Sequence, residues 1–284
     1  MTDRGWRWTV ALLRRLPAAA MSRAAGWLAD RRLPPSWRAP VLGWWARRLG
    51  ADVDEMDGCW RDYPTLDAWF TRRLRPGVRT WPTDPAVVAS PVDGVVGPVG
   101  CLDGDVLLQA KGLPYRAALL LGSEADAAAF LGGTYATFYL SPRHYHRVHT
   151  PVPGRLERAR HLPGRVLPVH PAVVAREPDL LPGNERLVAW LRTAHGLVAV
   201  VAIGAMNVAR VTAAFDRTLV ANRRRCAGER RYEPPRCLRH GDELFLFRLG
   251  STVVVLAAPG AIRWDLETGR EVRVGEVVGY AGCS

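Results

Sequence analysis

Short apolar runs separated by glycine and proline dominate the chain from about residue 85 to its end. Such runs of apolar and β-branched residues between turn residues are typical of β-strands. The pattern therefore predicts a β-rich body with many turns, and the clearest runs cover residues 87–89, 95–96, 106–108, 137–140, 197–203, 244–247 and 253–256. One helix is predicted over 123–130, where Ser123 can cap the N-terminus and acidic residues follow in the first turn.

The first 75 residues carry a different pattern, in which short apolar stretches are broken by arginines. Within residues 54–74, apolar side chains recur at the i, i+3, i+4 and i+8 spacing of one helix face, at Leu66, Trp69, Phe70 and Leu74. The Pro-Gly pair at 76–77 ends this pattern. We therefore predict an α+β protein, with an amphipathic helical region over 1–75. A β-rich domain over 76–284 would consist of barrel-sandwich-like sheets with a few helices.

Tryptophan and arginine are concentrated near the N-terminus. Nine of the 11 tryptophans lie in the first 81 residues, at positions 6, 8, 27, 37, 44, 45, 60, 69 and 81. Residues 1–50 contain ten arginines but only two acidic residues, Asp3 and Asp30. This composition suits a membrane interface, where indole rings lie at headgroup level and guanidinium groups bind lipid phosphates. The alternative is a helical subdomain whose tryptophans pack on the core while its arginines are solvated.

No apolar stretch in this region approaches the roughly 20 residues that a membrane-spanning helix needs. Residues 17–20, Pro-Ala-Ala-Ala, are similar to a signal-peptide cleavage site. Arg14 and Arg15 interrupt the apolar segment that a signal peptide requires. The sequence therefore predicts association with a membrane surface rather than a span or a cleaved leader.

The formal net charge is +12, and it comes almost entirely from arginine, because Lys111 is the single lysine. A basic surface suits nucleic acid or an anionic membrane. No nucleic-acid-binding motif accompanies the charge, so we expect no nucleic-acid partner. The five cysteines form no C-x-x-C pair, which indicates a reducing compartment without a disulfide framework or a structural zinc site.

Two segments in the first half of the β-rich domain carry candidate chemistry. Residues 90–94, Ser-Pro-Val-Asp-Gly, place Asp93 in a turn between apolar runs, where a purely structural aspartate is also common. Residues 139–151 contain three histidines, His144, His146 and His149. On an extended chain the first two would share a face. These histidines could bind a metal, but no cysteine or acid lies close in sequence, so a general base oriented by a carboxylate is the better use.

The third segment is Leu249-Gly250-Ser251-Thr252, between the predicted strands 244–247 and 253–256. A hydroxyl directly after a glycine peptide is placed to attack its own backbone, whereas an ordinary glycine bulge in a sheet is the alternative. Asp93, a histidine and Ser251 would together form a triad in the general sense. Ser251 lacks the G-x-S-x-G elbow of α/β-hydrolases, which argues against a hydrolase acting on an external ester.

These three segments, in this order, resemble those of bacterial phosphatidylserine decarboxylases, a pyruvoyl-dependent and membrane-associated family. Similar blocks occur at 67–76, at Asn184-Glu185-Arg186 and at Ile203-Gly204-Ala205, and Leu249-Gly250-Ser251-Thr252 is identical to the family's self-cleavage motif. Two positions depart from the family pattern. Val92 stands where a smaller residue is frequent, and Ala209-Arg210 stands where a Gly-Ser pair is more usual. A non-catalytic peripheral membrane protein on the same fold is the alternative.

The resemblance implies a proenzyme that cleaves itself between Gly250 and Ser251. Asp93 would orient His149, and His149 would deprotonate Ser251 for attack on the Gly250 carbonyl. The resulting ester would eliminate to dehydroalanine, which hydrolyses to a pyruvoyl group with loss of ammonia. The products would be a β chain, residues 1–250, and an α chain, residues 251–284, and the domain over 76–284 would be catalytic.

The implied cofactor is the covalent pyruvoyl group derived from Ser251, with neither a metal nor pyridoxal phosphate. Its carbonyl would form a Schiff base with the amine of phosphatidylserine and act as the electron sink for decarboxylation to phosphatidylethanolamine. His146 resembles the family histidine that acts in this step. The implied partners are the lipid substrate in its membrane, the α and β chains of one proenzyme, and a second αβ unit in a homodimer. The implied location is the cytoplasmic face of the cell membrane, in phospholipid biosynthesis.

Overall fold

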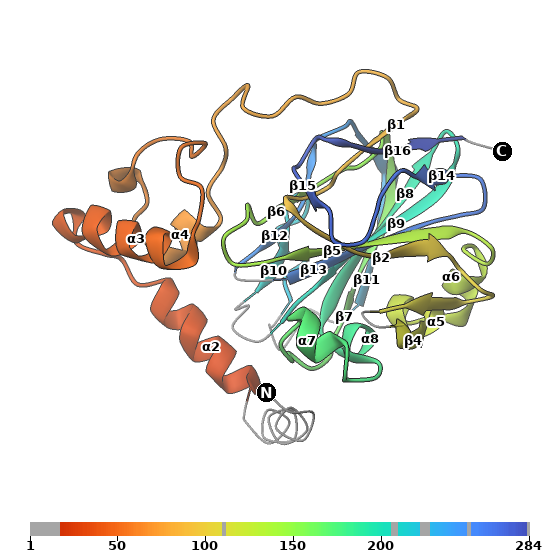
Figure 1. The fold of residues 1–284 in the computed structure, drawn as a ribbon, viewed down its shortest axis with the longest axis horizontal. Coiled ribbons are helices and arrows are strands. Elements are labelled where there is room, and N and C mark those ends of the chain that lie inside the picture. Colours follow the sequence, from red (N-terminus) through yellow and green to blue (C-terminus); the bar gives the residue numbers. More distant parts are fainter. Residues whose placement is uncertain (1–17, 110–111, 206–209, 222–227, 249–250, 283–284) are drawn as a thin grey trace.

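The computed structural model describes residues 18–109, 112–205, 210–221, 228–248 and 251–282 (Figure 1). Its largest element is an antiparallel sheet of eight strands in the order β11-β7-β8-β9-β13-β5-β2-β15. These strands are β2 (Gly94–Cys101), β5 (Thr134–Leu140), β7 (Gly154–Leu162), β8 (Arg186–Thr193), β9 (Gly196–Ile203), β11 (Gly228–Leu238), β13 (Ser251–Ala257) and β15 (Glu271–Val272). Because β13 lies between β9 and β5, it has a hydrogen-bonded neighbour on both sides.

Smaller sheets complete the β-structure of the described residues. One has the order β1-β16-β14 and another the order β10-β12-β6, while β3 and β4 form a hairpin. Their strands are β1 (Val87–Ala89), β3 (Val106–Leu108), β4 (Pro114–Arg116), β6 (Arg147–His149), β10 (Val211–Ala213), β12 (Glu243–Phe247), β14 (Ile262–Trp264) and β16 (Val277–Ala281). The predicted strands over 87–89, 137–140, 197–203, 244–247 and 253–256 are thereby confirmed.

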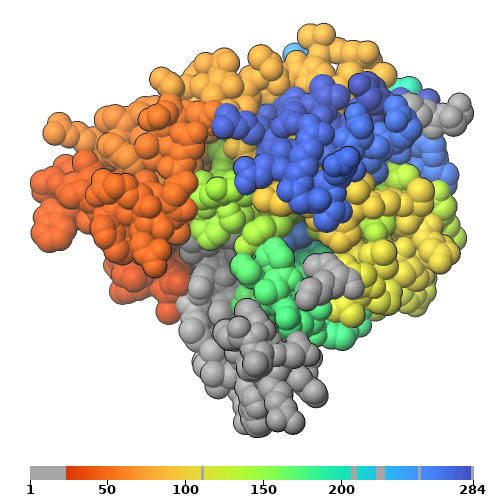
Figure 2. Space-filling model, in the orientation of Figure 1, coloured from red at the N-terminus to blue at the C-terminus, as the bar shows by residue number. Residues whose placement is uncertain are grey.

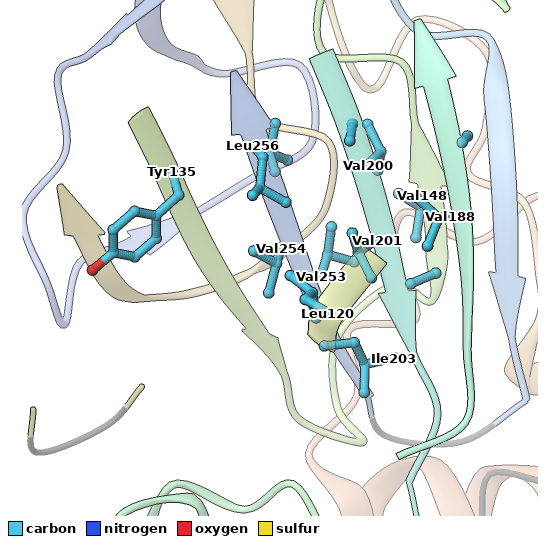
Figure 3. Close-up of a cluster of buried hydrophobic side chains, with 14 of the residues drawn as sticks. Leu120, Tyr135, Val148, Val188, Val200, Val201, Ile203, Val253, Val254 and Leu256 are labelled. Carbon is cyan, nitrogen blue, oxygen red and sulfur yellow. The ribbon is translucent and has the colours of Figure 1, made fainter. Parts of the chain in front are cut away.

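The hydrophobic core lies along the middle of the large sheet. Every residue of β13 is buried, as is every residue of β9 except its first. Figure 3 shows their side chains together with Leu120, which belongs to the same cluster. Burial on both faces explains why these strands carry continuous apolar runs rather than alternating ones.

Four short helices accompany the sheets of the body: α5 (Ala117–Leu121), α6 (Glu124–Ala128), α7 (Pro171–Val174) and α8 (Leu180–Gly183). The structure confirms the helix predicted after Ser123. The Ser123 hydroxyl accepts a hydrogen bond of 3.2 Å from the Asp126 amide and so caps α6. The Asp126 carboxylate binds Arg158 and Arg160 of β7, each at 2.6 Å, which fixes the helix against the sheet.

The N-terminal helices form a lobe at one side of the body (Figures 1 and 2). They are α2 (Ala18–Ala29), α3 (Pro35–Leu49), the 3₁₀ turn η1 (Trp60–Asp62) and α4 (Leu66–Phe70). The lobe has a small hydrophobic cluster of its own, whose buried members are Leu42, Ala46, Met56, Trp69 and Phe70. The described part of the chain therefore contains two separate hydrophobic clusters, one in the lobe and one in the body.

The helix predicted within 54–74 is much shorter in the structure. Only Leu66–Phe70 is α-helical, because Pro64 precedes it and the Thr65 hydroxyl accepts the Ala68 amide at 2.9 Å as an N-cap. The predicted face is correct for Trp69 and Phe70, which are buried in the cluster of the lobe. Leu74 was wrongly assigned to that face, since it pairs as a β-bridge with Met56.

The prediction of a β-rich α+β protein with tryptophan-bearing N-terminal helices is confirmed. Trp27, Trp37 and Trp44 are 61%, 61% and 53% exposed, although exposed indoles are unusual in a helical lobe with its own core. Within the described residues, no helix has the length and apolar character to cross a membrane.

Candidate active site

Three strands of the large sheet, β13, β5 and β2, bring the candidate segments to one end of the sheet. The first residue of β13, Ser251, pairs with Leu140, the last residue of β5. Neighbouring strands are antiparallel, so the histidine segment leaves β5 at the end of the sheet where β13 begins. β2 also begins at this end, directly after Asp93. β2 and β13 are separated by β5, which places their backbones two strand spacings, about 10 Å, apart. Segments far apart in sequence thus meet around Ser251.

Ser251 is fully buried, and its hydroxyl oxygen has no hydrogen-bond partner among the described residues. Its backbone is held by β5 on one side, and the next residue, Thr252, pairs with Ile203 of β9. Leaving a buried hydroxyl unpaired costs about 1–3 kcal/mol, so such a group in a well-packed core calls for an explanation such as reactivity. Gly250, the predicted partner in cleavage, lies outside the described residues.

Asp93 is fixed by a guanidinium and a backbone amide. Its carboxylate accepts one hydrogen bond from Arg79 at 3.1 Å and another from the Val274 amide at 2.7 Å. Arg79 also pairs with Glu55 of the N-terminal lobe at 2.6 Å. No local pattern in the sequence marks Arg79 or Glu55 for this role, because the bonds join residues from the lobe, the connecting segment and the body.

His149 is buried at the end of β6 and uses both ring nitrogens. The Nδ1 atom lies 2.6 Å from the Gly241 carbonyl, which can only accept, so Nδ1 carries the proton. The Nε2 atom is therefore the basic nitrogen, and it accepts the Tyr145 hydroxyl at 3.1 Å. Burial lowers the pKa of His149, which keeps the ring neutral and able to take a proton at Nε2.

The side chains of Asp93, His149 and Ser251 are not hydrogen-bonded to one another in the part of the chain that the structure describes. The connection between the first two is through the backbone, because the His149 amide donates to the Pro91 carbonyl at 2.8 Å. Two cavities lie beside these residues. One of about 310 Å³ is lined by Asp93 and His144, and one of about 200 Å³ is lined by His149. Tyr145 lines both, so it stands between the aspartate and the histidine.

The histidine segment does not run as an extended chain throughout. The His144 amide donates to the Ser141 carbonyl at 3.0 Å, which closes a turn before β6 begins. The expectation that His144 and His146 share the face of a strand is therefore wrong. The turn separates them, so that His144 lines the larger cavity while His146 is buried beneath.

His146 is fully buried against the ring of Phe70, with ring centroids 4.2 Å apart. Its Nδ1 atom donates to the His144 carbonyl at 2.7 Å, and its Nε2 atom has no partner among the described residues. Burial lowers the pKa of His146 to about 3, so the ring is neutral at neutral pH. Like the hydroxyl of Ser251, Nε2 is a buried polar atom without a hydrogen-bond partner in the described part of the chain, and it is available to a substrate group.

Acidification is expected to destabilise the uncleaved protein through His146. The pKa is 6.5 for an unperturbed histidine and about 3 in the fold, so between these values the unfolded chain binds more protons. The free energy of unfolding therefore falls as the pH falls, by at most about 1.4 kcal/mol per pH unit for this one group. Urea unfolding of the Ser251→Ala protein at about pH 7 and about pH 5 measures the effect. The pH dependence should be smaller when His146→Gln is added, and an equal dependence would contradict the assignment.

These residues fit a pyruvoyl group made from Ser251. The residue pairs with β5, the next residue pairs with β9, and its buried oxygen has no hydrogen-bond partner among the described residues. A sequence profile described as phosphatidylserine decarboxylase matches residues 66–280. The chain belongs to the phosphatidylserine decarboxylase family. The matched range includes Asp93, His146, His149 and Ser251, whereas α2 and α3 precede it.

Curated relatives extend the likeness over nearly the whole chain. The phosphatidylserine decarboxylase proenzyme of Anaeromyxobacter sp. (strain K) is 45% identical over 276 residues, which cover 96% of this chain and 98% of that protein. The proenzyme of Halorhodospira halophila is 43% identical over 93% of this chain and 90% of its own length. That of Myxococcus xanthus is 37% identical over 94% and 96%. The predicted family, activity and pyruvoyl cofactor class are thereby confirmed.

Proposed function

We propose that Asp93, His149 and Ser251 carry out the self-cleavage of this phosphatidylserine decarboxylase proenzyme, and that His146 acts in the decarboxylation that follows. The observation that carries the proposal is the hydroxyl of Ser251, which is buried and has no partner among the described residues. It lies at the end of the sheet from which the aspartate and histidine segments also emerge. Ser251 and His149 are polar groups buried in the body, while Asp93 lines a cavity beside Arg79, and such clusters of perturbed polar groups are typical of reactive sites.

The first reaction uses only groups of this chain. Neutral His149 takes the hydroxyl proton at Nε2, which requires it to exchange the Tyr145 hydroxyl for that of Ser251. The Ser251 oxygen then forms a bond to the Gly250 carbonyl carbon while the peptide C–N bond breaks and the released nitrogen takes the proton back from His149. The peptide is thereby converted into an ester with a free amine. Loss of the Ser251 α-proton and of the Gly250 carboxylate leaves dehydroalanine, and water replaces its nitrogen, which departs as ammonia. The carboxylate of Asp93 stabilises the protonated form of His149 through its negative charge, while the Gly241 carbonyl orients the ring.

The second reaction needs an electron sink. A pyruvoyl group supplies an electrophilic carbonyl that accepts the electron pair left at the substrate Cα when CO2 departs. The residues of this chain would hold the lipid headgroup in a buried site and transfer protons. His146 suits the second task, since its buried Nε2 is unprotonated and has no partner among the described residues. It can take up a proton released earlier in the reaction and then give that proton to Cα.

The N-terminal helices are proposed to hold the protein on the cytoplasmic face of the cell membrane. An apolar groove of about 580 Å³ on α3 is lined by Ser36, Trp37, Pro40, Val41, Trp44 and Trp45. On α2, the exposed ring of Trp27 carries the Arg31 guanidinium 3.7 Å above its centroid. Indole rings beside guanidinium groups match the headgroup layer of an anionic membrane. The substrate is itself a lipid, so this placement brings its headgroup to the site.

Vesicle binding and activity, measured on the same variant, test whether the exposed tryptophans of α3 form a membrane-binding face. The Trp37→Ala/Trp44→Ala variant is expected to bind phosphatidylserine vesicles at least about tenfold more weakly. Burial of each indole in the interface contributes roughly 1 kcal/mol or more to the free energy of binding. Its conversion of detergent-dispersed phosphatidylserine to phosphatidylethanolamine should stay near the wild-type rate. Tyr280→Ala removes an exposed aromatic side chain from β16 of the body and serves as the control. Unchanged vesicle binding by the tryptophan variant would refute the membrane face.

The organisation of the chain follows from these roles. The separate hydrophobic clusters of the lobe and the body support a helical membrane region over 1–75 and a catalytic domain over 76–284 with barrel-sandwich-like sheets. Cleavage would leave a β chain of residues 1–250 and an α chain of residues 251–284. The pairing of β13 with β5 and β9 would keep the two chains together. A homodimer of αβ units is compatible with this arrangement.

A further inference from the structure

Four charged residues join the N-terminal lobe to the chain just before Ser251. Arg248 donates through one guanidinium nitrogen to Asp67 of α4 and lies 3.4 Å from Asp30, which follows α2. Arg210 binds the other carboxylate oxygen of Asp30. We refer to Asp30, Asp67, Arg210 and Arg248 as the ion cluster. It contains two carboxylates and two guanidinium groups, and it links both the end of α2 and α4 to the body.

The arginines of the ion cluster compensate two carboxylates that are unfavourably placed. Asp67 is 91% buried, and burial raises its pKa, which Arg248 counteracts. Asp30 lies at the C-terminal end of α2, where the helix dipole disfavours a negative charge. Both carboxylates are therefore in places that are unfavourable without the arginines. A single guanidinium shared between Asp30 and Asp67 offsets the repulsion between them.

The position of Arg248 gives the ion cluster its significance. Only Leu249 and Gly250 lie between it and Ser251, so three virtual bonds, at most about 11 Å, connect the two residues. On the far side of the bond, Ser251 pairs with Leu140 of β5 and the next residue, Thr252, pairs with Ile203 of β9. On the near side, Phe247 pairs with Val211 of β10 and the Arg248 amide donates to the Arg210 carbonyl at 3.2 Å. Among the described residues, Arg248 is the last one before the bond, and its side chain anchors the chain there.

We propose that Asp67 and Asp30, acting through Arg248, are positioning residues for self-cleavage. The inference rests on the proposed function of Ser251. The lobe would thus be part of the processing machinery as well as a membrane anchor, because it fixes Arg248, two residues before the bond that Ser251 attacks. Misplacement of a reacting group by about 1 Å can slow a reaction up to about a hundredfold. The same contacts would hold the end of the β chain after cleavage.

Arg210 extends the ion cluster through Asp30. A short side chain such as serine could not span to Asp30 as this guanidinium does. Arg210 binds Asp30 but not Asp67, so we expect Arg210→Ser to slow cleavage less than Arg248→Met does.

The test is a time course of cleavage during cell-free synthesis of the full chain, with the 34-residue fragment, residues 251–284, identified by mass. Arg248→Met and Asp67→Asn should each slow its appearance at least tenfold, whereas Arg248→Lys, which keeps the charge, should stay within about threefold of wild type. In the double variant Arg248→Met/Asp67→Asn the two effects should not add, because both remove the same contact. Circular dichroism and thermal melting establish that each variant is folded.

The matched control is Asp126→Asn. Asp126 is another carboxylate bound by two arginines, with a side-chain exposure of 13% against 11% for Asp67, but it lies on α6, away from the lobe (Figure 1). It should cleave at the wild-type rate. Wild-type rates in folded Arg248→Met and Asp67→Asn, with the fragment still beginning at residue 251, would overturn the ion cluster's role and leave the proposed function standing. A wild-type protein that never yields this fragment would overturn the proposed function, and with it this inference.

Discussion

Replacement of Ser251 by alanine is expected to leave the chain intact and to abolish decarboxylation. Alanine has no oxygen to attack the Gly250 carbonyl, and without cleavage no pyruvoyl group can form. The loss should be complete within the limits of an assay of phosphatidylethanolamine production, rather than a partial slowing. Ser251 is packed at the start of β13 with an unpaired hydroxyl, so removing that oxygen should not destabilise the fold.

The matched control for this substitution is Ser141→Ala. Ser141 lies directly after Leu140, the residue that pairs with Ser251, and its hydroxyl is near His144 Nδ1 at 3.4 Å. This variant should still release the 34-residue fragment, residues 251–284. Release of the same fragment from Ser251→Ala would show that another residue cleaves the chain, and the assignment of Ser251 would be wrong.

Substitution of the two buried histidines is expected to separate the two reactions. His149→Ala should remain uncleaved, because the base for Ser251 is lost. His146→Ala should cleave but turn over phosphatidylserine at least about a hundredfold more slowly, as is typical for loss of a general acid or base. Cleavage is read by electrophoresis under denaturing conditions, and turnover is measured on the cleaved protein alone.

The exposed residue His195 provides the control for both histidine variants, since His195→Ala should be cleaved and active at wild-type rates. If His146→Ala failed to cleave, its role would belong to the first reaction. If His149→Ala cleaved normally, the base would have to be a different group, for which neutral His146 with its unpaired Nε2 is the nearest alternative in sequence.

Much of the body could be predicted from the sequence because its signals are local. The continuous apolar run at 253–256 predicts a buried strand, and β13 is that strand, with neighbours on both sides. The Gly-Ser pair before it was ambiguous between a bulge and a reactive bond. The presence of Asp93 and the histidines in the sequence favoured the reactive bond. The antiparallel register explains why such distant segments meet at one end of the sheet.

The contacts of the site could not be predicted, because they join residues far apart along the chain. Nothing in the local pattern indicates that Arg79 binds Asp93, or that Tyr145 occupies the basic nitrogen of His149. The helix expected over 54–74 failed for a related reason. Its apolar spacing was correct over one turn, but Thr65 capped a short helix and Leu74 found a partner in Met56 instead.

The ion cluster gives the clearest example of such distance. Arg248 and Asp67 are 181 residues apart, and Arg210 and Asp30 are 180 apart. Arg210 was notable in the sequence only as a departure from the family pattern. Its meaning depends on the packing of α2 against the body, which only the three-dimensional structure supplies.

The mass of the purified wild-type protein tests the central claim most directly. The account predicts two chains, residues 1–250 with a free carboxylate and a 34-residue fragment, residues 251–284, that lacks an N-terminal amine. The fragment should be lighter by one ammonia than the peptide beginning with serine. A single intact chain, or a fragment that begins with an unmodified Ser251 amine, would contradict the account.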